Sequence, residues 1–262
     1  MDRNENLEEL YKDQLLWSKP IVYKNITLYP VTCENLIDFY SSIQVLLYDP
    51  IRYPTDVSTL PRLYFLTDIL NHQYDEIYLS QNPMLQILFT QLMVLFKLVL
   101  KENQELLACN NNGNWYLKVK APNIDGEEMN VKDIDIKAKD FDEIRKIILH
   151  QNGVDYDDTF VHEDIRKWIA KQEEKEKSTP ATLEDYMDAF ILSTHIVDEN
   201  IIKQLSIRRF NRIIDKSITR ENYNIQATAS LSGFVSFKGK IEHWLHIEKK
   251  NGIFDKYFKE LK

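Results

Sequence analysis

An acidic run at residues 155–164 is the densest cluster of side chains that could hold a metal ion or transfer a proton. It contains five carboxylates and one histidine, His162. A calcium loop requires a glycine at its sixth position and a bidentate glutamate at its end, and this run has neither. Carboxylates also stabilise the first turn of a helix, because they meet the positive end of its dipole. We therefore interpret the run as a solvated turn leading into a helix, and predict no metal site there.

Two histidines, His243 and His246, lie three residues apart in a segment that is predicted to be helical, so both could face one ion. The zinc-protease signature His-Glu-x-x-His also carries a glutamate base and needs a third ligand, and this pair has neither. We interpret both as packed or capping histidines beside Trp244 and Leu245.

No serine or cysteine has the surroundings of a nucleophile. Ser41, Ser193 and Ser232 lack the Gly-x-Ser-x-Gly elbow, and Cys33 has no histidine at a signature spacing. The sequence also lacks the glycine-rich motifs that cradle phosphates. We therefore predict a protein that is not an enzyme and that has no catalytic, cofactor-binding or metal-binding residues.

A basic face is the most regular pattern in the sequence. Its members are Arg208, Arg212, Lys216 and Arg220, spaced every four residues, with Arg209 beside the first. Such a helix face suits an acidic partner helix or nucleic acid. It also suits a solvated face whose charges pair with Asp215 and Glu221. The charge balance favours the solvated face, because the first 180 residues carry 20 basic against 30 acidic side chains and could neutralise it within the chain.

Aromatic residues near the end of the sequence are the second candidate for partner binding. They are Trp244, Phe254, Tyr257 and Phe258. These residue types are enriched at interface hot spots, although closing the core of the protein would explain them equally well. Residues 181–262 are therefore the predicted contact region, through the basic residues 208–220 and these aromatics.

Hydrophobic periodicity predicts a helix-dominated α+β fold. Apolar residues recur at three- and four-residue intervals, as on the buried side of a helix, over 4–16, 33–48, 60–71, 83–101, 140–150, 163–177, 182–193, 198–204, 206–227 and 241–261. Alternating residues predict a small antiparallel sheet of about three strands within 105–137, and a minor hairpin at 21–29. The charged stretch 172–177 and the Ser-Thr-Pro that follows predict a boundary between an α+β domain, 1–178, and a helical domain, 179–262.

The composition indicates a soluble globular protein. Hydrophobic residues make up 44% and charged residues 28% of the chain. A net charge of −8 argues against a general nucleic-acid binder. The widely spaced Cys33 and Cys109, with no secretory leader before them, predict free thiols in a reducing compartment. The apolar stretch 83–100 is interrupted by Gln86, Gln91 and Lys97, so we predict a buried helix rather than a membrane span.

Several strings resemble a family of uncharacterised proteins from tailed bacteriophages and prophages of Gram-positive bacteria. They span about residues 20 to 246 and read Leu28-Tyr29-Pro30-Val31, Phe39-Tyr40-Ser41, Asp140-Phe141-Asp142-Glu143-Ile144, Gln151-Asn152-Gly153-Val154, Ile207-Arg208-Arg209-Phe210, Leu231-Ser232-Gly233-Phe234-Val235, Phe237-Lys238 and Ile241-Glu242-His243-Trp244.

This resemblance implies a product of the tail-morphogenesis region, acting as a tail assembly chaperone in the cytoplasm of the infected host. Its implied partner is the tape-measure protein or a tube or baseplate subunit. Two alternatives remain open: a structural component of the virion, such as a baseplate or connector part, and a nucleic-acid-associated phage protein acting through residues 208–220. The oligomeric state is not predicted.

Overall fold

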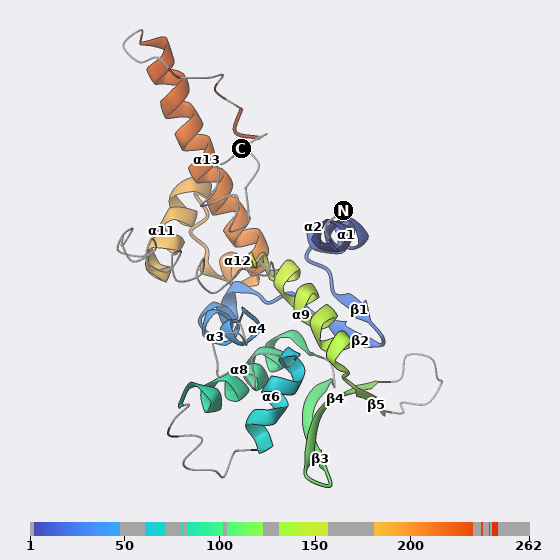
Figure 1. Ribbon diagram of the computed structural model, residues 1–262. Helices are drawn as coiled ribbons and strands as arrows, with labels where there is room; N and C mark the ends of the chain where they lie inside the picture. The colour runs from blue at the N-terminus through green and yellow to red at the C-terminus, as the bar shows by residue number, and fades with distance from the viewer. Residues whose placement is uncertain are drawn as a thin grey trace. The chain divides into compact units, whose positions relative to one another are not determined.

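Helices dominate the fold, and the strands form two small antiparallel sheets (Figure 1). This arrangement confirms the predicted α+β class. The computed structural model describes residues 3–47, 61–71, 80, 83–101, 104–122, 131–156, 181–232, 237, 241 and 243–245. Contacts between Cα atoms divide the chain into two units, which we describe separately. Unit 1 comprises Met1–Val154 and Lys203–Arg208, and unit 2 comprises Asp155–Ile202 and Arg209–Lys262.

This division differs from the predicted boundary between residues 178 and 179, which lies outside the described residues. The segment Lys203–Arg208 belongs to unit 1 because its backbone is hydrogen-bonded there. The N–H of Cys33 donates to the carbonyl of Leu205 at 2.8 Å, and the N–H of Ile207 donates to the carbonyl of Val31 at 2.9 Å. A short stretch far along the sequence therefore completes the first unit.

Unit 1 contains most of the described elements. They are α1 (Arg3–Leu10), α2 (Lys12–Leu16), β1 (Ile21–Tyr23), β2 (Ile26–Leu28), η1 (Cys33–Asn35), α3 (Leu36–Ser42), α4 (Gln44–Leu47), α6 (Arg62–Asn71), α8 (Pro83–Val99), β3 (Glu105–Asn111), β4 (Asn114–Pro122), β5 (Val131–Asp135) and α9 (Ala138–Asn152).

Two tight turns set the registers of the two sheets. Lys24 and Asn25 both have positive φ, 47° and 68°, as a two-residue hairpin loop requires, and Tyr23 pairs with Ile26. Asn112 and Gly113 form the corresponding two-residue turn between β3 and β4, with φ of 51° and 85°. The three-stranded sheet is the predicted meander, in the order β3-β4-β5.

Helix α8 lies at the centre of unit 1. Its side chains Leu92, Leu95, Phe96 and Val99 are all buried, and α3, α4 and α6 contact it. On the sheet, Leu117 and Val119 of β4 are buried and alternate with more exposed neighbours, and α6 contacts this strand. The predicted buried helix is thus present. Over the described residues, no helix is both long and apolar enough to span a bilayer.

A buried arginine is a feature that periodicity did not predict. Arg145 of α9 is among the largest fully buried side chains of the protein, and its Nε donates to the carbonyl oxygen of Leu46 at 2.6 Å. That carbonyl lies at the end of α4, where a helix leaves its last carbonyl groups without backbone partners. Arg145 therefore satisfies a buried helix end and ties α9 to α4.

Three predicted helices differ from the observed elements. The segment 4–16 breaks at Tyr11, and the segment 33–48 opens with a short 3-10 helix and breaks at Ile43. In the predicted helix 241–261, the described residues 241 and 243–245 are not helical. The predicted helix 163–177 lies outside the described residues.

The remaining described helices are α11 (Leu183–Thr194), α12 (Glu199–Gln204) and α13 (Ile207–Leu231). Helix α11 starts with a capping box. The N–H of Asp185 donates to Thr182 Oγ1 at 3.2 Å, and the N–H of Thr182 donates back to the Asp185 carboxylate at 2.7 Å. Within unit 2, the buried rings of Phe190 and Phe210 stack with centroids 5.0 Å apart and join α11 to α13.

Candidate partner-binding surface

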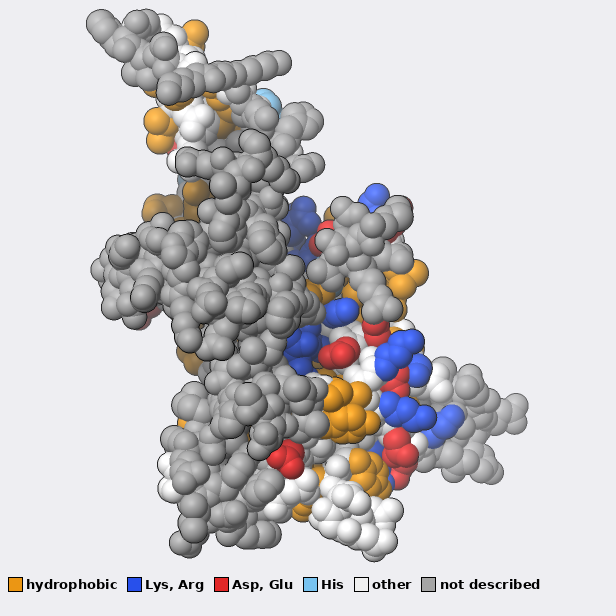
Figure 2. All heavy atoms as spheres, viewed as in Figure 1, with side chains coloured by type: hydrophobic (Ala, Val, Ile, Leu, Met, Phe, Trp, Pro, Cys, Tyr) orange, Lys and Arg blue, Asp and Glu red, His pale blue; other side chains and the backbone are white. Residues whose placement is uncertain are grey.

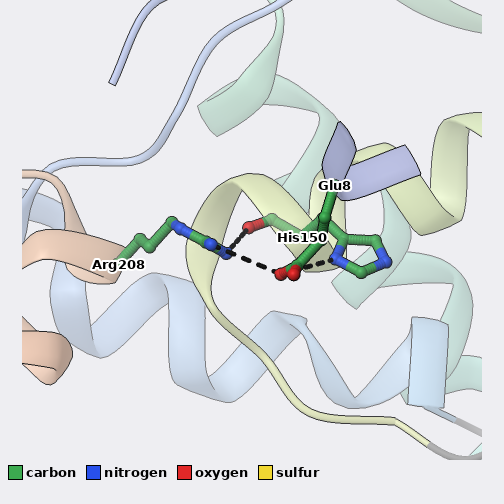
Figure 3. Close-up of polar contacts among 3 residues, drawn as sticks. All are labelled: Glu8, His150 and Arg208. Atoms are coloured by element: carbon green, nitrogen blue, oxygen red, sulfur yellow. Dashed lines mark hydrogen bonds and ion pairs between the residues drawn. The ribbon is translucent and has the colours of Figure 1, made fainter. Parts of the chain in front are cut away.

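Arg208 is separated from the rest of the predicted basic face. Its guanidinium Nη1 donates to the carbonyl oxygen of His150 at 2.5 Å, and its Nη2 lies 3.4 Å from Glu8 Oε1 (Figure 3). The side chain is only 14% exposed. Gly153 lies beside it in a left-handed conformation, φ 66°, and a Cβ there would sit 3.2 Å from Arg208 Cγ. Arg208 thus joins the start of α13 to α1 and to the end of α9 inside unit 1.

Glu8 carries the charge that opposes Arg208 and His150. The His150 imidazole, with Nδ1 3.7 Å from Glu8 Oε1, has the largest influence; burial opposes it, and the guanidinium of Arg208 adds to it. Together they lower the pKa of Glu8 from 4.5 to about 2.

Replacing Glu8 with glutamine should lower the free energy of unfolding at pH 7 by less than about 1 kcal/mol, because the side chain is 57% exposed. The folded-state pKa is depressed, so the contribution of Glu8 is complete above pH 4.5 and is lost as pH falls towards 2. Urea unfolding at several pH values measures this. The gap between wild type and Glu8→Gln should close between pH 5 and pH 2, and a gap that stays constant would contradict the ion pair.

The other four basic residues of the predicted face belong to unit 2. Arg209, Arg212 and Arg220 are exposed and Lys216 is half-buried. At 100° per residue they lie on the side of α13 opposite the buried Phe210 and Ile214. Except for Arg208, the predicted basic face is therefore a single surface of one helix.

Of the predicted aromatics, only Trp244 is among the described residues. It is half-buried, and its ring centroid lies 5.8 Å from that of His243, which in turn lies 5.1 Å from the ring of Tyr223 on α13. Phe254, Tyr257 and Phe258 lie outside the described residues. Their assignment to a partner contact stays a prediction.

An open groove lies between α11 and α13 in the described part of unit 2. Its volume is about 300 Å³. Its apolar lining comprises Ala189 and Leu192 from α11 and Ile214 and Ile218 from α13, and its polar lining comprises Ser193, Ser217, Glu221 and Asn222. Leu192 is 77% exposed and Ile218 is 52% exposed. Large apolar side chains thus face solvent on both walls.

The apolar stripe of α13 is longer than the helix that packs on it. Helix α11 has 12 residues and α13 has 25, which correspond to about 18 Å and about 37 Å at 1.5 Å per residue. Ile214, Ile218 and Ile225 follow one line along α13. Ile214 is buried, whereas Ile225 is 64% exposed. The stripe therefore continues beyond the part that Phe190 and its neighbours cover.

In the described part of the chain, no three His, Cys, Asp or Glu side chains lie close enough together to hold a metal ion. Most of the acidic run, from Asp157 to Asp164, and His246 lie outside it. The prediction that neither group binds a metal stays a prediction.

On the face of unit 1 near α9 and β5, basic and acidic side chains alternate (Figure 2). Two ion pairs account for part of this pattern: Lys24 Nζ lies 2.7 Å from Asp140 Oδ1, and Lys118 Nζ lies 2.7 Å from Asp133 Oδ2. Neither sign dominates the face. It offers no one-signed surface to a charged ligand.

The sequence pattern indicated the basic face of α13 as a candidate for partner binding, but not the apolar side of the same helix. The apolar side carries the buried Phe210 and Ile214, and isoleucine recurs on it at 218 and 225, beyond the reach of a 12-residue helix. The difference in length between the predicted helices 182–193 and 206–227 was the signal in the sequence that could have indicated this exposed apolar side. Comparison with protein-family models, curated proteins and solved structures gives no match for the chain.

Proposed function

We propose that this protein acts without catalysis, by holding an apolar helical segment of another protein in the groove between α11 and α13. The observation that carries the proposal is the open apolar groove, with Leu192 and Ile218 exposed on its two walls. Helix-in-groove binding uses such a surface, because anchors spaced three or four residues apart on the incoming helix fill it. The uncovered Ile225 extends the contact along α13.

The size of the groove suits a reversible contact. Full burial of a leucine or isoleucine contributes about 1.5–3 kcal/mol, so covering the exposed parts of Leu192 and Ile218 contributes about 2–4 kcal/mol together. Association costs at least about 4 kcal/mol in lost freedom of motion. Additional contacts along the stripe of α13 are therefore needed, and the net affinity is modest. A protein that must later release its partner requires such an affinity.

The sequence resemblance supplies the biological setting of the proposal: a phage tail assembly chaperone in the cytoplasm of the infected host, with the tape-measure protein as partner. Some of the residues that carry the resemblance are packing residues of unit 1. Leu28 and Val31 are buried, the Val31 N–H donates to the buried Asn152 Oδ1 at 2.8 Å, and Ile207 donates to Val31. These contacts hold unit 1 together, whereas the groove supports the proposed binding.

Co-expression with the candidate tape-measure protein, followed by capture, tests this function. Leu192→Asp and Ile218→Asp should each lower capture at least tenfold, since each places a charge at an apolar contact. Ile37→Asp is the matched control, because Ile37 is as exposed as Leu192 but belongs to unit 1. Equal capture by all variants would contradict the groove. A fixed copy number in purified virions would instead indicate a structural component.

A further inference from the structure

In the described part of unit 2, carboxylates lie beside the groove. The segment 181–202 contains five carboxylates and no lysine or arginine. On α11, the exposed Asp188 precedes the groove residue Ala189 and lies one turn before Leu192, and on α13 Glu221 itself lines the groove.

The basic residues of α13 lie away from the carboxylates beside the groove. Arg212, Lys216 and Arg220 lie on the side of the helix opposite Ile214. The two sides of α13 therefore differ in character: one is basic, and the other is apolar beside carboxylates. Among the described residues, the charged side chains beside the groove are therefore carboxylates, and a ligand meets them at its edges.

We infer that the groove selects amphipathic helices that carry lysine or arginine beside their apolar stripe. This inference rests on the proposed function and adds the charge of the partner to it. Apolar contact alone does not distinguish one amphipathic helix from another. Like charges across an interface disfavour a partner, and opposite charges favour and steer it. With Asp188 and Glu221 next to the groove, a cationic helix is favoured and an acidic helix is rejected.

Three synthetic peptides of 18 residues test the inference on the full chain. They share one leucine stripe at helical spacing and carry lysine, glutamine or glutamate beside it. Fluorescence anisotropy should show the lysine peptide binding about tenfold more tightly than the glutamine peptide at 50 mM salt, with the glutamate peptide weakest. At 500 mM salt the preference should fall to about twofold, because screening shortens the reach of exposed charges.

Charge reversal at the groove separates this preference from a general attraction to an acidic protein. The double variant Asp188→Lys and Glu221→Lys should reverse the order of the lysine and glutamate peptides. The matched control, Glu34→Lys and Asp38→Lys, makes the same change of net charge on exposed residues of unit 1 and should keep the order. Equal responses of the two double variants would overturn the inference.

The outcomes also distinguish this inference from the function on which it rests. If the three peptides bind equally well and Leu192→Asp weakens all of them, the groove binds helices without charge selection, and only the inference fails. If none of the peptides binds, the proposed function fails as well. Self-association in sedimentation that Leu192→Asp abolishes would assign the groove to a second copy of the chain and overturn the inference.

Discussion

Replacing Leu92 with alanine is expected to lower the free energy of unfolding by about 2–5 kcal/mol. Leu92 has no exposed surface, and its helix α8 contacts α3, α4 and α6. Removing its side chain loses the transfer free energy of the buried carbons and leaves a cavity. Helices packed from several sides can close such a cavity only in part.

Urea unfolding followed by circular dichroism measures this change. Val94→Ala is the control, because Val94 lies on the same helix and its side chain is exposed. A surface replacement of this kind should change stability by no more than about 0.5 kcal/mol. Similar values for the two variants would show that α8 does not form the core of unit 1.

Replacing Phe190 with alanine is expected to cost about 3–5 kcal/mol in unit 2. Phe190 is the one fully buried side chain that α11 contributes among those described, and its stack with Phe210 joins α11 to α13. The loss is therefore concentrated at the junction of the two helices that form the groove. Capture of a partner helix should fall together with stability.

Amide hydrogen exchange resolves this effect within the chain. A loss of 3–5 kcal/mol corresponds to exchange that is faster by a factor of about 10² to 4 × 10³ over residues 183–194. Leu192→Ala, two residues away at an exposed position, should leave exchange there nearly unchanged while weakening capture. Unchanged exchange in Phe190→Ala would contradict the packing of α11 on α13.

Interactions between residues close in sequence were predictable. The hairpin turn at Lys24 and Asn25, the meander of strands, and the capping box of Thr182 with Asp185 each involve groups within a few residues. Their geometry follows from backbone sterics and from the spacing of donors and acceptors, so the type of element and its approximate limits could be derived. The breaks at Tyr11 and Ile43 could not be predicted, because periodicity continues across them.

Contacts between distant residues were decided by the tertiary structure alone. Arg145 and the carbonyl it satisfies are 99 residues apart, and Arg208 and Glu8 are 200 residues apart. The sequence identified a row of basic residues on one helix, but only packing determined that Arg208 is bound within unit 1 while Arg212 and Arg220 are exposed. The groove likewise depends on where a short helix meets a long one. Helical spacing determines which side chains share a face, whereas packing decides which of them remain accessible.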